Sequence, residues 1–477
     1  MNECITETTR HFTPAASLAA LGVKLQQMNL FEPIRQRVQI AQKTVKYRPM
    51  DKLYDGFITL LAGAHGLVEI NTRLRADPAL QAAFGRTGCA EQSVVQQTLD
   101  CCTAENTGQM QQAVDSIYRQ HSRGYGHDYQ ADWQVLDVDM SGWLCGKKAE
   151  FATKGYFASQ QRNRRGRQLG RVLATRYQEV VVDRLFAGNR QLNTTLQELV
   201  EAAEVTLELT EEQRAHCLLR IDAGGGSVPN LNWLLERGYH LLAKACSGQQ
   251  ARQLAKTVQE WITDPHLPER QVGWVTEQAL AFVRPVRRVA VRCPKPNGQW
   301  GVGVLICWLS DQDILHLAGR PACEAQDPHA VLLALLWLYD QRGGGIETSF
   351  QGDKGVGLTK RNKKRFAAQQ MLMLLGSLVH NVIVWAHDWL TGAASAASAA
   401  SAQASGQAPA TCDPLPGYGM VRMVRDVFHI SGFLCWDASG QIVQIVLNQD
   451  AHLARRLLLS LRQLLAPMHV VINLDKT

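Results

Sequence analysis

Three acidic positions in this sequence could act together in one chemical site. Asp137 and Asp139 in LDVDMS lie on the same face of a predicted strand, because side chains two residues apart in a strand point the same way. Asp222 in LLRIDAGGG lies at the exit of an apolar predicted strand. Glu347 lies in YDQRGGGIETSFQGDK and precedes Lys354 by two turns of a predicted helix, so both would share one helix face.

Carboxylates at the ends of neighbouring strands can converge with a carboxylate from a packed helix. Three carboxylates without cationic partners repel one another, and therefore hold divalent cations rather than remaining bare. Two Mg²⁺ ions about 3.5–4 Å apart, for which Mn²⁺ can substitute, would activate a water or a 3′-hydroxyl and stabilise the leaving oxygen of a phosphodiester. A single Asp at a strand end is more often a turn former or a helix cap, so the hypothesis depends on the order and context of all three.

Positive charge is clustered along the chain. Residues 151–180 contain seven cations and one carboxylate, although the net charge of the whole chain is only +7. A second basic cluster follows Glu347 and contains Lys360, Arg361, Lys363, Lys364 and Arg365. Clusters of this kind indicate a polyanionic partner, most simply nucleic acid, and the alternative is two solvated surface patches.

The cysteines and apolar segments indicate a cytoplasmic protein. None of the 12 cysteines forms a C-x-x-C pair, which favours reduced thiols in a reducing compartment. The N-terminus MNECITETTR lacks the basic and apolar regions of a secretory signal. The longest apolar run, AVLLALLWLY, is too short to span a bilayer, so no membrane contact is expected.

The residues from Asp132 onward alternate between strands and helices. DWQVLDVDMSG and GRVLATRYQEVVVDRLFAG predict three strands, and QLNTTLQELVEAAEVTLE predicts a helix. HCLLRIDAGGG and YHLLAKA predict two more strands on either side of the helix VPNLNWLLERG. The expected fold class is therefore α/β, with a mixed sheet flanked by helices.

A β-rich insertion interrupts this pattern. In VRRVAVRC, Val289 and Val291 alternate with Arg288 and Arg292, which predicts a strand with a cationic face. PKPNGQW supplies an Asn-Gly turn before the partner strand GVGVLICWL. The first 125 residues instead read as short helices, which could form a helix-turn-helix or a small helical cap.

Six segments are expected in chain order. They are a helical N-terminal DNA-binding domain at 1–125, the first part of the catalytic core at 126–245, the β-rich insertion at 246–330, the second part of the core at 331–391, an Ala/Ser-rich linker at 392–411 and a C-terminal segment at 412–477.

Between about Asp132 and Trp385 the sequence resembles a DDE transposase of the bacterial insertion-sequence type, in the group with a Tyr-Arg-Glu-Lys signature on a ribonuclease H-like core. The residues that carry the resemblance are Asp139 in DMS, Asp222, Tyr339, Arg342, Glu347 and Lys354. The family has three residues between the Arg and the Glu, whereas GGGI makes four here.

The resemblance assigns roles to these residues. It implies that Asp139, Asp222 and Glu347 are catalytic and hold two Mg²⁺ ions, and Ser141 at the family spacing favours Asp139 over Asp137. Arg342 and Lys354 would grip phosphates, and Tyr339 would contact the same backbone. The other expected DNA contacts are Arg162, Arg164, Arg165, Arg167, Lys360, Lys363 and Trp300, where Trp300 would stack on a flipped base unless it is a buried structural residue.

The predicted function is metal-dependent cleavage at transposon ends followed by strand transfer into target DNA. Double-stranded DNA is the expected partner, and a homodimer on DNA in the nucleoid is expected because two ends must be handled together. The alternatives are a ribonuclease H-like nuclease or domesticated recombinase that does not integrate, and a catalytically inactive DNA-binding protein.

Overall fold

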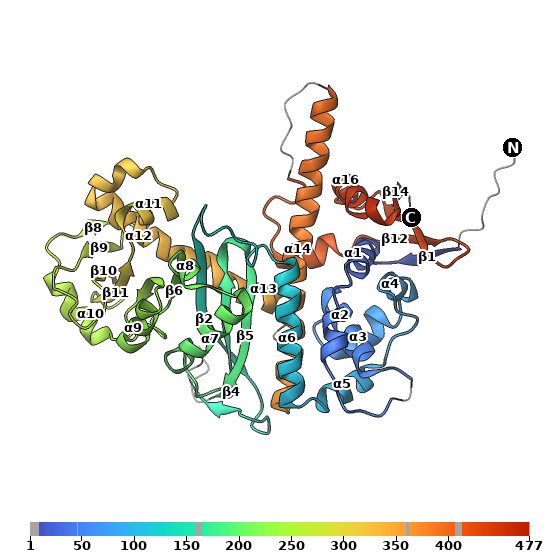
Figure 1. Cartoon of the computed structure of the whole chain (residues 1–477), viewed down its shortest axis with the longest axis horizontal. Helices are drawn as coiled ribbons and strands as arrows, with labels where there is room; N and C mark the ends of the chain where they lie inside the picture. Colours follow the sequence, from blue (N-terminus) through green and yellow to red (C-terminus); the bar gives the residue numbers. More distant parts are fainter. Residues whose placement is uncertain are drawn as a thin grey trace. The chain divides into compact units, whose positions relative to one another are not determined.

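The computed structural model describes residues 9–44, 46–155, 157, 164–358, 362–405 and 413–476, without the side chains of 394–405. The chain forms two compact units (Figure 1). Residues 121–350 form the central unit, and residues 1–120 together with 351–477 form the terminal unit. The predicted segments divide differently, because residues 351–391 of the expected core and both ends of the chain fold together in the terminal unit.

The central unit contains one mixed sheet in which five strands follow the order β5-β4-β2-β6-β7. β2 pairs in parallel with β6 and β6 with β7, whereas β4 is antiparallel to both β2 and β5. The strand bounds are β2 Gln134–Leu144, β3 Thr153–Lys154, β4 Arg165–Ala174, β5 Glu179–Ala187, β6 Cys217–Ile221 and β7 His240–Lys244. The α/β class is therefore confirmed at the level of a mixed sheet with flanking helices.

The β-rich insertion continues the same sheet instead of forming a separate layer. β11 pairs antiparallel with β7, and β10, β9 and β8 follow outward. The predicted hairpin turn is present, because Gly298 has a φ of 75° and its N–H donates to the Lys295 carbonyl at 2.9 Å. The strands are β8 Ile262–Thr263, β9 Gln271–Trp274, β10 Arg287–Pro294 and β11 Trp300–Trp308.

Helices cover this sheet. α7 packs on β2, β4 and β5, and α9 packs on β7. α12 shares a buried apolar core with β6, β7, β10 and β11, through residues such as Leu335, Leu218 and Val289. The helical bounds are η4 Thr175–Tyr177, α7 Leu192–Leu207, α8 Glu211–Arg214, α9 Val228–Glu236, α10 Gly248–Leu254, η5 Ala255–Thr257, α11 Asp311–Leu317, η6 Ala322–Gln326, α12 Pro328–Arg342, η7 Gly343–Glu347 and α13 Thr348–Gly355.

The terminal unit is built from both ends of the chain. β1 near the N-terminus pairs antiparallel with β12, and the sheet order is β1-β12-β13-β14 (Figure 1). The elements are β1 Thr9–Thr13, α1 Ala16–Gln27, α2 Glu32–Arg37, α3 Pro49–Leu61, η1 Leu67–Glu69, η2 Ile70–Leu74, α4 Pro78–Ala83, α5 Gln92–Asp100, α6 Ala104–His121, α14 Phe366–Ser405, α15 Met420–Arg422, η8 Met423–Val427, β12 Gly432–Trp436, β13 Ile442–Asn448, α16 Ala454–Leu465, η9 Ala466–Met468 and β14 Val471–Asp475.

α14 corrects the predicted linker. The helix continues to Ser405, so residues 392–405 are helical, and the rest of the expected linker to residue 411 lies outside the described residues. Alanine is the strongest helix former, and it fills this segment. Residues 366–393 are long and apolar enough to cross a membrane, but 83% of their most apolar stretch is buried inside the structure, which makes this the core helix of the unit.

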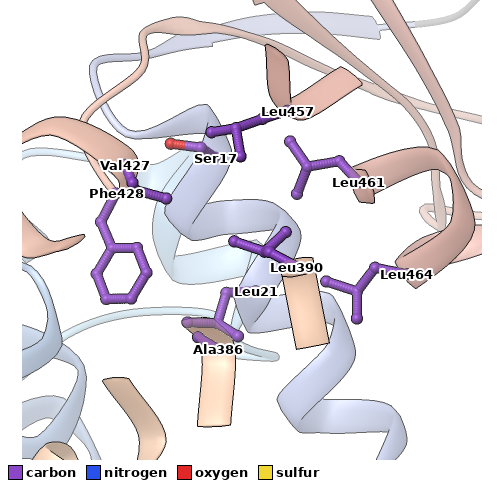
Figure 2. Close-up of a pocket in the computed structure, with 9 residues that line it drawn as sticks. All are labelled: Ser17, Leu21, Ala386, Leu390, Val427, Phe428, Leu457, Leu461 and Leu464. Atoms are coloured by element: carbon purple, nitrogen blue, oxygen red, sulfur yellow. The ribbon is translucent and has the colours of Figure 1, made fainter. Parts of the chain in front are cut away.

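A small apolar pocket remains where α14 meets α1, η8 and α16 (Figure 2). Leu390 of α14, Leu21 of α1 and Leu461 of α16 line it, and Ser17 supplies the single polar side chain among the lining residues. Its volume is about 10 Å³, which is at the lower limit for one water. It is therefore a packing gap in the core and not a ligand site.

Candidate active site

Two of the predicted acids lie next to each other on the central sheet. β2 and β6 are parallel, and their last paired residues are Val138 and Ile221. Asp139 and Asp222 are the next residue on each strand, so the register places them side by side at the carboxyl end of β6. The β6 strand ends there because the backbone turns, and the Gly224 N–H donates to Asp222 Oδ1 at 2.7 Å.

Burial and negative charge act together on Asp139. Burial, opposed by Arg342 and helped by the Asp222 carboxylate, raises the pKa of the Asp139 carboxyl to about 6. Asp139 Oδ1 also accepts a hydrogen bond from the Met140 N–H at 2.7 Å. A buried carboxyl with a carboxylate neighbour and a raised pKa is a candidate functional group.

Arg342 contacts both Asp139 and the third predicted acid, Glu347. Its Nη2 lies 2.5 Å from Asp139 Oδ2, and its Nη1 lies 3.3 Å from Glu347 Oε1. Arg342 therefore links Asp139 to Glu347 in the central unit, while Asp222 lies beside Asp139 through the register of β2 and β6.

A π-helical turn makes this contact possible. In an α-helix, residues five apart such as Arg342 and Glu347 would point about 140° away from each other. The turn η7, Gly343–Glu347, contains one residue more than an α-helical turn and brings both side chains together. The four-residue spacing that departs from the family pattern is thus absorbed within one turn.

Only one glycine of this turn is required sterically. A Cβ on Gly345 would lie 2.5 Å from Asp137 Oδ2 and 2.7 Å from Thr175 Cγ2, so η7 approaches β2 closely at this point. Nothing in the described part of the structure lies within 4 Å of a Cβ built on Gly343 or Gly344.

Gly345→Ala is therefore expected to destabilise the chain by about 1–3 kcal/mol, because the methyl group would force η7 away from β2. Gly344→Ala is the matched control, and it should leave the free energy of unfolding unchanged or slightly increased. Urea unfolding of both variants measures the difference. Equal stability of the two variants would contradict the close approach of η7 to β2.

The runner-up acid Asp137 has a different role. It is fully buried, and both its oxygens accept hydrogen bonds from Arg220, at 2.7 and 2.9 Å. Arg220 Nη1 also donates to the Leu338 carbonyl of α12 at 2.7 Å. Asp137 thus holds Arg220, which in turn anchors the helix that carries Arg342. This pairing favours Asp139 as the acid available for chemistry.

Tyr339 lies in the same cluster. Burial raises the pKa of its hydroxyl, Arg342 lowers it, and the carboxylates of Asp222, Asp139 and Glu347 raise it further. The phenol is therefore neutral and can donate or accept a hydrogen bond at the site. Lys354, by contrast, is exposed on α13 and belongs to the terminal unit.

The donor set fits a hard divalent cation in its chemistry. Three carboxylates, two of them adjacent, are the ligands that Mg²⁺ uses, and the Glu347 side chain is 55% exposed. Within the described residues no three His, Cys, Asp or Glu side chains already lie close enough together to hold a metal ion. The guanidinium of Arg342 supplies the positive charge between Asp139 and Glu347 here.

The predicted DNA-contacting arginines divide into two groups. Arg164 and Arg165 are exposed at the start of β4. Arg167 is 1% exposed, and its Nε and Nη2 donate to the Glu150 carbonyl, so the prediction that it contacts DNA is wrong. Arg171 is also buried, and it pairs with Asp183. Their positions within β4 turn these two side chains into the interior.

Of the remaining cations predicted to contact DNA, the structure describes only Lys363. Arg162 and Lys360 lie outside the described residues. Lys363 is buried in the terminal unit and its Nζ donates to Gln96 Oε1, so a direct contact of Lys363 with DNA is wrong.

Trp300 is an exposed residue and not a buried structural one. Its side chain is 44% exposed at the start of β11. The Arg292 guanidinium lies 4.6 Å from the Trp300 ring centre and 3.9 Å from that of Trp261. The sequence pattern placed Arg292 on the cationic face of its strand, but it gave no signal for Trp261. Trp274, in contrast, packs against the central core.

The burial of Asp139 gives a pH-dependent prediction. A pKa raised to about 6 means that stability is lost as the pH rises from the ordinary aspartate range through 6, because the folded chain favours the protonated form. Without divalent cations, Asp139→Asn should therefore stabilise the chain at pH 8 by about 3 kcal/mol, and by little at pH 4. Thermal unfolding at both pH values measures this effect, with the exposed Glu201→Gln as control. A destabilised Asn variant at pH 8 would contradict it.

The comparisons with known proteins show a likeness to a solved structure. The sequence matches no family model and no curated protein. Among solved structures, the chain is similar to piggyBac transposase in its synaptic complex with hairpin DNA. The similarity covers 88% of this chain and 82% of that chain, with 10% identity and a TM-score of 0.44. At this level it assigns no residue and no activity here, and the Tyr-Arg-Glu-Lys group of insertion-sequence enzymes stays a prediction.

Proposed function

We propose that this chain is a DNA transposase that cleaves phosphodiesters at transposon ends and transfers the strands into target DNA. Two observations carry the proposal: Asp139 and Asp222 are neighbours on parallel strands, and Arg342 pairs with both Asp139 and Glu347. These acids would hold Mg²⁺, or Mn²⁺ in its place, and the bound ions would activate the attacking oxygen and stabilise the leaving one.

The arrangement of strands supports a ribonuclease H-like core for this activity. β2 is central in the order β5-β4-β2-β6-β7, with β4 and β5 joined by antiparallel pairing on one side and β6 and β7 by parallel pairing on the other. The first acid is on the central strand and the second follows the adjacent parallel strand. Carboxyl ends of parallel strands are where open sheets place their functional groups.

Arg342 has donors left for a phosphate. Its Nε is buried and has no hydrogen-bond acceptor in the described part of the chain. An unsatisfied buried donor is costly unless a ligand completes it. We infer that Nε would donate to a phosphate oxygen of the bound strand, in the manner typical of arginine. Tyr339, with its neutral hydroxyl, would contact the same strand.

The expected partners follow from this chemistry. Double-stranded DNA would bind as transposon ends and as target, with strong salt dependence because phosphate contacts release counterions. Two ends must be joined in one reaction, which favours a homodimer on DNA. A cytoplasmic, nucleoid-associated location is part of the same proposal.

A strand-transfer assay tests the function. The full chain is incubated with linear DNA carrying the sequences that flank its gene, a supercoiled target and Mg²⁺ or Mn²⁺. Nicking at the ends, followed by joined products, is the expected result. Cleavage without joining would instead establish a nuclease or a recombinase that does not integrate.

A second candidate is a DNA-binding protein without catalysis. The pairing of Arg342 with two of the three carboxylates favours it, because a guanidinium in the acidic cluster already neutralises charge that metal ions would otherwise balance. Tight DNA binding with no cleavage in Mg²⁺ or Mn²⁺ would support this candidate against the transposase.

A further inference from the structure

A cationic segment in the terminal unit has no part in the proposed active site. Residues 37–48, here named the basic strap, connect α2 to α3 and contain Arg37, Lys43, Lys46 and Arg48 but no carboxylate. These four side chains are exposed, and Val45 of the strap lies outside the described residues. In the described chain, none of the four cations forms an ion pair with a carboxylate.

Several described residues of the basic strap are held on the protein surface. Val38 and Ile40 are buried, and Gln39 between them is exposed, as in an extended strand. Gln42 Oε1 accepts hydrogen bonds from Lys52 Nζ at 3.0 Å and from Thr98 Oγ1 at 2.7 Å. The cations therefore project from an anchored backbone.

Tyr47 anchors the far end of the strap. A Cβ on Gly88 would lie 2.7 Å from the Tyr47 hydroxyl oxygen, so the ring packs closely on the chain at that point. Fixing both ends lowers the entropy cost of ordering the cations on a ligand.

The second basic segment of the chain reaches the same helix. Lys363 Nζ donates to Gln96 Oε1, and Arg365 Nη1 donates to the Asp100 carbonyl. Both acceptors belong to α5, as does Thr98, which contacts the strap. Two basic segments more than 300 residues apart in the sequence therefore meet on α5.

We infer that the basic strap and the exposed Arg365 form a surface around α5 that binds the phosphate backbone of double-stranded DNA. The choice of DNA rests on the proposed function. Anchored cations without carboxylate partners release counterions when they meet phosphates, which is the main source of such affinity. The exposed residues Ser93 and Gln97 of α5 are uncharged, whereas the exposed Glu91 before the helix and the half-buried Asp100 at its end are acidic.

The test uses the full-length variant Lys43→Ala/Lys46→Ala. Fluorescence anisotropy with a labelled DNA duplex gives the Kd between about 50 and 200 mM KCl. Loss of two phosphate contacts should weaken binding by about tenfold or more, and should reduce the slope of log Kd against log salt by about 2. An unchanged melting temperature shows that the variant is folded, since both lysines are exposed.

Arg455→Ala/Arg456→Ala is the matched control, because it removes the same charge from the exposed face of α16 in the same unit. α5 and α16 lie at opposite ends of this unit (Figure 1). The control should lose less than about threefold in affinity. Equal losses in the two variants would overturn the inference, since binding would then follow net charge and not the basic strap.

Two further results separate this inference from the proposed function. If the strap variants lose DNA binding but the native chain never cleaves, the surface stands and the transposase proposal fails. If the native chain cleaves and joins DNA while the strap variants bind normally, the surface is wrong and the function stands. Tighter binding of a double-stranded RNA of equal length would overturn the choice of DNA.

Discussion

Asp222→Asn should lower metal-dependent DNA nicking by about a thousandfold or more, while DNA binding stays unchanged. The substitution keeps the shape of the side chain and its hydrogen bond from the Gly224 N–H, but it removes one negative charge beside Asp139. A neutral amide binds Mg²⁺ more weakly than a carboxylate does. Supercoil relaxation by the native and variant chains at equal protein concentration measures the effect.

Glu236→Gln is the control for this experiment. Glu236 is exposed at the end of α9 in the same unit, so its replacement removes an equal charge without touching the cluster. The control should nick at the native rate. Full activity of Asp222→Asn would show that Asp222 is not catalytic. It would also contradict the proposal that acids on the parallel strands β2 and β6 together hold the metal ions.

Arg220→Met should destabilise the chain by about 3–5 kcal/mol, because it leaves the Asp137 carboxylate buried without a partner. Nicking should also fall, since the Leu338 carbonyl of α12 loses its hydrogen bond from Arg220. Urea unfolding gives the loss of stability.

A double-mutant cycle makes this prediction sharper. Adding Asp137→Asn to Arg220→Met removes the buried charge, so the double variant should recover a large part of the lost stability. If the two substitutions instead add independently, the pair is not the coupled buried ion pair that the geometry shows.

Local pattern predicted much of the core sheet. LDVDMS and LLRIDAGGG became β2 and the end of β6, because an apolar run that stops at an acid and a glycine cluster fits a buried strand and a turn. The alternation in VRRVAVRC likewise became β10 with its hairpin turn. These features depend on short stretches of sequence, which is why they could be read directly.

Long-range packing explains what could not be predicted. Asp137 and Arg220 are 83 residues apart, and only the parallel register brings them together. The burial of Arg167 depends on which face of β4 meets the rest of the unit. The Ala/Ser-rich segment at 392–405 is low in complexity, yet it continues a helix whose start is buried in the core. The π turn at Gly343–Glu347 has no periodic signature, since it is one residue added to a regular helix.

The order in which the two units fold follows from which segments of the chain form the terminal unit. Residues 121–350 are contiguous, so the central unit can fold as the nascent chain leaves the ribosome. The terminal unit waits, because β1 needs β12 and Ser17 needs Ile430, 413 residues later. A nascent chain that ends soon after residue 350 therefore contains Asp139, Asp222 and Glu347 in the central unit, but its terminal unit is incomplete. Arg365, which joins the basic strap in the proposed DNA-binding surface around α5, is also synthesised only after the central unit.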